Sequence, residues 1–194
     1  MALIKKFRTR PVEGLKITAL IAFIFAFLWF AAPTWTSFWA GLPLVLLGTW
    51  IRSWAAGHLK RNKELATSGP YAYVRDPLYL GRFFLLCGFA VMAAAPITWL
   101  LFAIGLLVFF LNYMPRKLRK ETARLEKHFG QAYVDYKNAV RSLVPRLRPW
   151  PKSAQDRWNA RVYFTENREH WLILAVALFL AFMIIKILHP DLFH

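Results

Sequence analysis

The sequence predicts an all-α integral membrane protein with five transmembrane helices and a cytosolic amphipathic helix between the fourth and the fifth. Hydrophobic residues fill 58% of the 194 positions and the mean hydropathy is +0.35; soluble domains usually reach only about 45–50%. These residues gather in five blocks, each near the roughly 20 residues that a helix needs to cross a bilayer. Lys and Arg are concentrated in alternate connections between the blocks. The length indicates one membrane domain, residues 1–194.

The apolar blocks follow one another with short turns after the first and the third. They cover residues 15–32, 38–57, 78–95, 97–114 and 171–188. Prolines follow four of them, and we expect each proline to stop its helix, including Pro115 after the fourth block. The short turns predict antiparallel hairpins. The first block is longer than the core of a signal peptide, so we expect it to be a retained helix.

The charge of the chain predicts its orientation and its environment. The formal net charge is +16, and the basic residues lie before the first block, in 58–77 and in 115–169. This alternation predicts a cytosolic N-terminus and an outside C-terminus. Basic residues between apolar blocks favour membrane lipids rather than nucleic acid as partners. Cys87 stands alone and the five histidines are scattered, so we expect neither a disulfide nor a metal. The oligomeric state stays open.

Two features of the predicted cytosolic side are candidates for a functional site: a charged residue inside the second block and an amphipathic helix after the fourth. Arg52 lies inside the second block, about 8 Å from its inner end, where a charge costs at least about 2.5 kcal/mol. It faces a partner or wet cavity, or it reaches back to the headgroups. Residues 116–136 form a basic amphipathic helix with Gly130 as a candidate break. This helix is a plain interfacial anchor or a lid over a site. Residues 148–194 form an interfacial segment and an extra transmembrane helix.

The connection between the second and third blocks contains an ordered motif. It reads Gly69, Tyr71, Arg75, Pro77, Tyr79 and Gly81. A second element follows some 40 residues later: Glu121, Thr122, Leu125, Phe129, Gly130, Tyr133, Tyr136 and Pro145. Together they resemble the isoprenylcysteine carboxyl methyltransferase family and the related phospholipid methyltransferases. The resemblance covers residues 48–147, with Gly48 and Arg52, a cytosolic cofactor loop at 58–81 and the helix 116–136.

The residue types of the motif suit a charged cofactor. Gly69 and Pro70 predict a turn, and Pro77 predicts a helix start whose amides and dipole, with Arg75, could hold a carboxylate. Aromatic faces attract a sulfonium cation, and they are offered by Tyr71, Tyr73 and Tyr79. Tyrosines at a membrane interface are also ordinary belt residues. Glu121 offers a carboxylate to an amine or a ribose hydroxyl.

The resemblance implies a membrane methyltransferase that uses S-adenosyl-L-methionine (SAM). The implied cofactor residues are Lys63, Glu64, Leu65, Ala66, Gly69, Tyr71, Arg75, Asp76, Pro77, Leu78, Tyr79 and Glu121. Arg75 and Glu121 are the expected catalytic residues. The expected substrate-binding residues are Arg52, Arg116 and Lys117. His58 reaches the same site or is an ordinary interfacial residue.

Three departures from the family pattern leave the acceptor open. Asp76 replaces a histidine, Thr122 replaces a second glutamate and Lys117 replaces an arginine. Asp76 binds the cofactor amine or pairs with Arg75 or Arg82. We expect a lipophilic small molecule or a lipidated substrate, with prenylated carboxylates, ethanolamine lipids and hydrophobic thiols as candidates. The alternatives are an NADPH-dependent membrane reductase related to sterol reductases and a non-catalytic lipid-binding protein.

Overall fold

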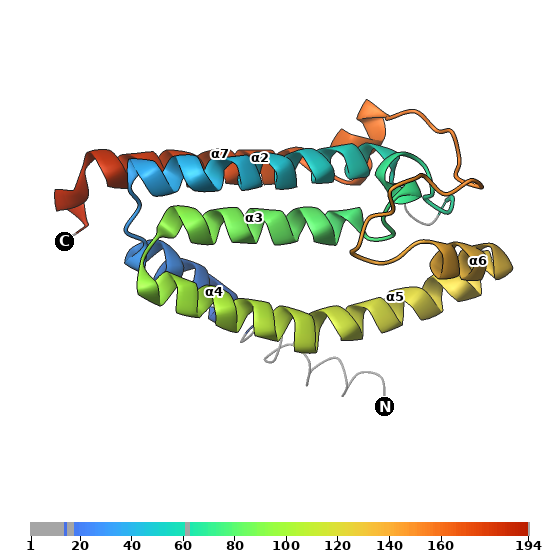
Figure 1. Cartoon of the computed structure of the whole chain (residues 1–194), viewed down its shortest axis with the longest axis horizontal. Helices are drawn as coiled ribbons and strands as arrows, with labels where there is room; N and C mark the ends of the chain where they lie inside the picture. The colour runs from blue at the N-terminus through green and yellow to red at the C-terminus, as the bar shows by residue number, and fades with distance from the viewer. Residues whose placement is uncertain (1–13, 15–17, 61–62, 194) are drawn as a thin grey trace.

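The computed structural model describes residues 14, 18–60 and 63–193, and every regular element in these ranges is helical (Figure 1). The predicted all-α class is confirmed. After a helix at Thr18–Phe30 come α2 (Trp35–His58), α3 (Pro77–Ala93), α4 (Pro96–Val108), α5 (Met114–Phe129), α6 (Gln131–Ala139) and α7 (His170–Leu188). Short helical turns lie at Gly69–Ala72, Phe109–Tyr113, Val162–Glu166 and Pro190–Leu192.

α2, α3 and α7 form the packed centre of the molecule and run alongside one another (Figure 1). The backbones of α2 and α3 approach closely at two glycine pairs, Gly41 with Gly88 and Gly48 with Gly81. A Cβ added to Gly48 would lie 2.6 Å from the carbonyl oxygen of Gly81. Glycines seven residues apart lie on one helix face, and small residues there allow close packing in a membrane. This packing fixes the distance between the two helices that lead into the site.

Lys186 of α7 anchors the first described helix. Its buried Nζ donates to the backbone carbonyls of Leu28 (3.1 Å), Trp29 (2.7 Å) and Ala31 (2.6 Å). The last carbonyls of a helix have no partner within the helix, and an unpaired carbonyl is costly in an apolar environment. Lys186 therefore caps the C-terminal end of Thr18–Phe30 from another helix.

Two predicted boundaries differ from the observed ones. α2 begins at Trp35 rather than at residue 38, because Thr34 and Ser37 form a reciprocal capping box. The fourth block does not stop at Pro115: α4 continues through a π-helical turn, Phe109–Tyr113, into α5. Pro115 lies in the first turn of α5 after this wider turn, where a missing N–H is tolerated. The prediction of a helix end at Pro115 was wrong.

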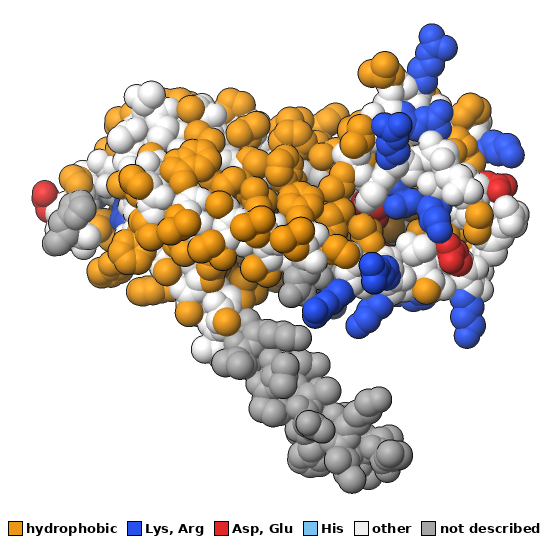
Figure 2. Space-filling view, turned by 60° about the horizontal axis from the view of Figure 1, so that its bottom comes forward, with side chains coloured by type: hydrophobic (Ala, Val, Ile, Leu, Met, Phe, Trp, Pro, Cys, Tyr) orange, Lys and Arg blue, Asp and Glu red, His pale blue; other side chains and the backbone are white. Residues whose placement is uncertain are grey.

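The apolar surface and the basic surface are separated along the molecule. Within the described ranges, two helical stretches are long and apolar enough to cross a membrane, Pro96–Phe129 and His170–Leu188, and Thr18–Phe30 and Pro77–Ala93 are apolar but shorter. Figure 2 shows hydrophobic side chains over most of one face and Lys and Arg gathered at one end. That end carries α5, α6 and the loop between α2 and α3 (Figure 1).

Candidate cofactor and acceptor site

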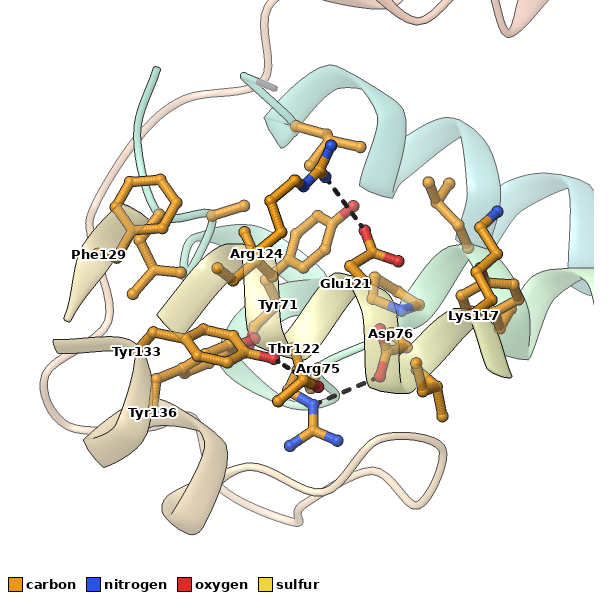
Figure 3. A pocket seen from close by; sticks show the side chains of 18 of the residues that line it. Tyr71, Arg75, Asp76, Lys117, Glu121, Thr122, Arg124, Phe129, Tyr133 and Tyr136 are labelled. Carbon is orange, nitrogen blue, oxygen red and sulfur yellow. Dashed lines mark hydrogen bonds and ion pairs between the residues drawn. The ribbon is translucent and has the colours of Figure 1, made fainter. Parts of the chain in front are cut away.

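A cavity of about 590 Å³ lies at the basic end of the molecule. Five parts of the chain line it: the end of α2, the loop after α2, the start of α3, the α5–α6 pair and the residue before α7. Figure 3 shows side chains of the loop after α2, of α5 and of α6 around this cavity. The two sequence elements that carry the family resemblance therefore meet at one site.

The chain that follows α6 fixes the loop from outside. The amides of Arg75 and Asp76 donate to the carbonyls of Arg141 (2.9 Å) and Ser142 (3.0 Å). The hydroxyl of Tyr136, which is 1% exposed, donates to the carbonyl of Tyr71 at 2.7 Å. These bonds satisfy polar backbone groups that a buried loop would otherwise leave unpaired. They also hold the side chain of Tyr71 at the cavity.

Gly69 and His58 support the loop without being among the residues that line the cavity. Gly69 has a φ of 57°, a left-handed conformation that glycine adopts without a Cβ clash. A Cβ at this position would lie 2.6 Å from the ring of His58. The Nδ1 of His58 is 3.0 Å from the Oγ of Ser68. The structure thus gives both residues a role in shaping the loop.

Arg75 and Asp76 form a brace at the entrance to α3. The Nε of Arg75 is 3.4 Å from Oδ2 of Asp76, and its Nη1 donates to the carbonyl of Lys137 at 3.3 Å. Figure 3 shows this guanidinium pointing away from Glu121. Ser142 donates to the same carboxylate at 2.6 Å. Burial raises the pKa of Asp76, opposed by the Ser142 hydrogen bond and the Arg75 charge.

The first turn of α3 offers fewer amides than the sequence suggested. The amides of Tyr79 and Leu80 donate to the carbonyl of Asp76 at 3.0 and 3.2 Å. A carboxylate bound at this helix start would compete with these bonds. Cationic side chains around the cavity are therefore the better candidates to hold an anion there.

α5 presents one polar face to the cavity. Lys117, Glu121 and Arg124 are spaced by three or four residues and therefore lie together on the helix. The carboxylate of Glu121 is 3.8 Å from Nη2 of Arg124, and the Nζ of Lys117 lies 5.2 Å from the ring centroid of Tyr79. Figure 3 shows the side chains of Lys117 and Glu121 projecting from α5. Thr122 and the hydroxyl of Tyr133 are 3.4 Å apart and link α5 to α6.

Arg52 is buried beneath the cavity rather than extended to the headgroups. It is 7% exposed, its Nε donates to Oε1 of Glu169 at 2.5 Å, and its Nη1 donates to the carbonyl of Leu78 at 3.0 Å. Both Arg52 and Glu169 line the cavity. Of the two interpretations of this charge within an apolar block, the structure shows the one in which Arg52 has a partner.

The structure brings most of the predicted site residues to one place. Those at the cavity are Arg52, Glu64, Leu65, Ala66, Tyr71, Arg75, Asp76, Pro77, Leu78, Tyr79, Lys117 and Glu121. Those that are not among its lining residues are His58, Lys63, Gly69 and Arg116. Lys63 instead donates to Glu166 at 2.6 Å on the surface, and Arg116 is exposed on α5.

The sequence reasoning missed about half of the lining residues. These are Leu59, Lys60, Arg82, Leu118, Lys120, Thr122, Arg124, Leu125, Phe129, Tyr133, Tyr136 and Glu169. The helical spacing of the α5–α6 residues predicts an amphipathic helix that is either an interfacial anchor or a lid over a site, and this spacing does not show which of its residues line a cavity. No sequence pattern places Glu169 at the site, because it lies far along the chain from either motif.

Comparison with known proteins identifies the family. The family model for phospholipid methyltransferases matches residues 21–132. The protein-S-isoprenylcysteine O-methyltransferase of Schizosaccharomyces pombe is 35% identical over 120 residues, 56% of this chain and 49% of the relative. The enzyme of that name from Rattus norvegicus is 33% identical over 127 residues, 59% of this chain and 43% of the relative.

A bacterial relative has a different name. The nickel-cobalt-cadmium resistance protein NccN of Alcaligenes xylosoxydans xylosoxydans is 33% identical over 121 residues, 61% of this chain and 53% of the relative. The chain spans about half the length of these curated relatives. No solved structure matches it. Because the family model covers more than half of the sequence, the chain belongs to the phospholipid methyltransferase family.

Proposed function

We propose that this chain is an integral membrane methyltransferase that uses SAM and methylates a lipophilic acceptor with a carboxylate group. The observation that carries the proposal is the cavity where the loop motif and the α5–α6 motif meet. Family membership supports the reaction class. The names of the matched relatives support an O-methyl transfer to an isoprenylcysteine-like acceptor, and they do not favour the reductase alternative.

The residues around the cavity fit the cofactor in size and chemistry. A volume of about 590 Å³ lies within the range of roughly 300–1,000 Å³ that small-molecule sites occupy. Glu64 and Glu121 suit an ammonium group or ribose hydroxyls, and the rings of Tyr71 and Tyr79 suit a sulfonium and an adenine. When bound, SAM supplies an electrophilic methyl group on sulfur. Lys117 and Arg124 are candidates for its carboxylate.

The charges of the cavity favour an anionic acceptor. Among the residues that the structure describes, seven Lys and Arg residues line it, against four Asp and Glu residues. A cleft lined by an excess of one sign concentrates ligands of the opposite sign. A carboxylate is already a nucleophile at neutral pH, so the protein must mainly orient it and exclude water. The apolar side chains of Leu118, Leu125 and Phe129 supply a dry wall for that purpose.

The same reasoning supports a particular membrane orientation. We propose that Thr18–Phe30, α2, α3, α4 with its π-helical extension, and α7 are five spans, and that the cavity faces the cytosol. The gathering of Lys and Arg at the cavity end supports this through the positive-inside rule (Figure 2). α5 and α6 then lie along the inner surface as a cover. A lipophilic acceptor enters from the bilayer while the cofactor enters from the cytosol.

Titration calorimetry with SAM on the detergent-solubilised chain tests the proposal. We expect saturable binding that Tyr79→Ala and Glu121→Ala weaken by roughly tenfold or more, since each removes a direct contact. Glu126→Ala is the matched control on α5, because its carboxylate pairs with Lys137 at 2.6 Å and does not line the cavity. Absence of binding, or equal effects of all three variants, would contradict the proposal.

Transfer of a radiolabelled methyl group from SAM then tests the reaction. N-acetyl-S-farnesylcysteine offers a lipophilic carboxylate, and phosphatidylethanolamine vesicles offer an amine. We expect label in the first acceptor. Label in the amine lipid alone would overturn the carboxylate assignment and retain the methyltransferase. NADPH oxidation without methyl transfer would support the reductase instead.

A further inference from the structure

We propose that Glu169 is a positioning residue, which orients Arg52 so that Arg52 can hold the anionic group of the acceptor. Glu169 lies beyond residues 21–132, the part of the chain that the family model matches. The segment after the family core would thus complete the site. The inference rests on the proposed function and deepens it by naming a determinant of acceptor recognition.

The geometry around Arg52 leaves one of its nitrogens for a ligand. Nε donates to Glu169 and Nη1 to the carbonyl of Leu78. Two hydrogen bonds to different parts of the protein fix the plane of a guanidinium, which carries five N–H donors. Between residues that the structure describes, no hydrogen bond of Nη2 is formed. Since Arg52 and Glu169 both line the cavity, Nη2 is the group that remains for an acceptor oxygen.

A clasp holds Glu169 against the end of α2; we use this name for residues 155–170. The side chain of Asn167 donates to the carbonyls of Ala56 (2.7 Å) and Leu59 (2.9 Å). Trp158 donates from its ring nitrogen to the carbonyl of Ser53 at 3.0 Å. Ala56 lies in the last turn of α2 and Leu59 is its C-cap, where carbonyls lack partners within the helix. Ser53 lies one turn earlier on the same helix. The clasp therefore fixes Glu169 relative to the same helix that carries Arg52.

The backbone next to Glu169 is strained. Arg168 has a φ of 51°, in the left-handed region that residues with a Cβ avoid. Such strain persists only where surrounding contacts determine the conformation, and it is commonest at functional sites. Here it lies at the turn that leads from the π-helical segment Val162–Glu166 into α7, immediately before the carboxylate that contacts Arg52.

A purely structural ion pair between α2 and α7 is the competing interpretation. A buried ion pair contributes little net stability, because the desolvation of both charges opposes their attraction. A structural role predicts that loss of Glu169 weakens all ligands alike or only lowers thermal stability. A positioning role predicts a selective loss for ligands that carry the anion. This difference makes the two interpretations separable.

Calorimetry on the full chain in detergent, with N-acetyl-S-farnesylcysteine and with its methyl ester, separates them. The two probes differ only in the anionic group. We expect the wild type to prefer the acid by roughly tenfold, the effect of one charge-assisted hydrogen bond. Glu169→Ala should bind the acid and the ester about equally, with unchanged affinity for the ester. Glu169→Gln should keep most of it, because the amide oxygen can still accept from Nε of Arg52.

The matched control is Glu166→Ala, three residues earlier in the clasp. Its carboxylate pairs with Lys63 on the surface, and such pairs contribute little. We expect wild-type behaviour. The inference is overturned if the wild type binds acid and ester equally, if Glu169→Ala keeps the preference, or if it weakens both probes equally. SAM is titrated in parallel to separate the proposed function from the role of Glu169. If only the role of Glu169 is wrong, the chain still binds SAM.

Discussion

The close contact of α2 and α3 at Gly48 gives a sharp test of how the helices position the site. Gly48→Ala places a methyl group 2.6 Å from the carbonyl oxygen of Gly81 and 2.8 Å from the amide nitrogen of Leu85. Both are backbone atoms, so no side-chain rotation relieves the clash. The first distance must grow to the 3.4 Å of ordinary contact, which separates the helices locally by 0.8 Å.

The magnitude follows from two opposing effects. Overpacking of this kind costs about 1–3 kcal/mol, and replacement of a mid-helix glycine by alanine returns about 0.5–1 kcal/mol. We expect a net destabilisation of about 1–2 kcal/mol, or a fall in Tm of about 2–8 °C for a chain of this size. A shift of 0.8 Å along the bond from Arg52 to the carbonyl of Leu78 would also lengthen it from 3.0 Å to 3.8 Å, beyond hydrogen-bond range.

Thermal unfolding in detergent, followed by circular dichroism, measures this effect. The matched control is Gly105→Ala on α4, where the nearest neighbour of a new Cβ is the ring of Phe23 at 3.4 Å, an ordinary contact. We expect this control to be as stable as the wild type or slightly more stable. Equal Tm values for the two variants would refute the conclusion that the glycine pairs set the helix spacing.

Three further substitutions test the loop at Tyr71, the carboxylate of Asp76 and the end of the helix Thr18–Phe30. Tyr136→Phe removes the hydroxyl that donates to the carbonyl of Tyr71; we expect about 1–2 kcal/mol of destabilisation and weaker SAM binding, and unchanged SAM affinity by calorimetry would contradict this. Asp76 has a raised pKa in the folded protein, so its stabilising contribution is complete below its ordinary pKa of 3.8 and is lost as the pH rises through the folded value. Asp76→Asn cannot ionise, so its Tm relative to the wild type should rise as the pH is raised from about 4; a difference in Tm that does not change with pH would contradict the raised pKa. Lys186→Met removes three bonds to the end of Thr18–Phe30 and should cost at least about 2 kcal/mol, with faster hydrogen exchange in that helix; unchanged exchange would disprove the cap.

The sequence alone identified the helical class and the two motifs that meet at the cavity. Apolar blocks and prolines report helix positions, because both reflect local chemistry and the demands of the surrounding solvent. Pro115 misled the boundary prediction, because a proline stops a helix only when the preceding turn is α-helical. Here the turn before Pro115 is π-helical, at Phe109–Tyr113, so the helix continues. The local composition does not indicate a π-helical turn.

Long-range partners were the part that the sequence could not supply. Arg52 was recognised as an unusual charge, but its partner Glu169 is 117 positions away and belongs to neither motif. Arg75 looked like a cofactor ligand, yet its guanidinium is directed to Asp76 and to the carbonyl of Lys137. In both cases the tertiary fold decides which of several possible partners a charged group meets.

A crystal structure of the complex with S-adenosylhomocysteine, the demethylated product of SAM, would test the central claim most directly. The account predicts density for this ligand in the cavity, in contact with Tyr71, Tyr79 and Glu121, with its sulfur atom directed toward Arg52. Density at another place, or a cavity filled by side chains when the ligand is present at saturation, would contradict it.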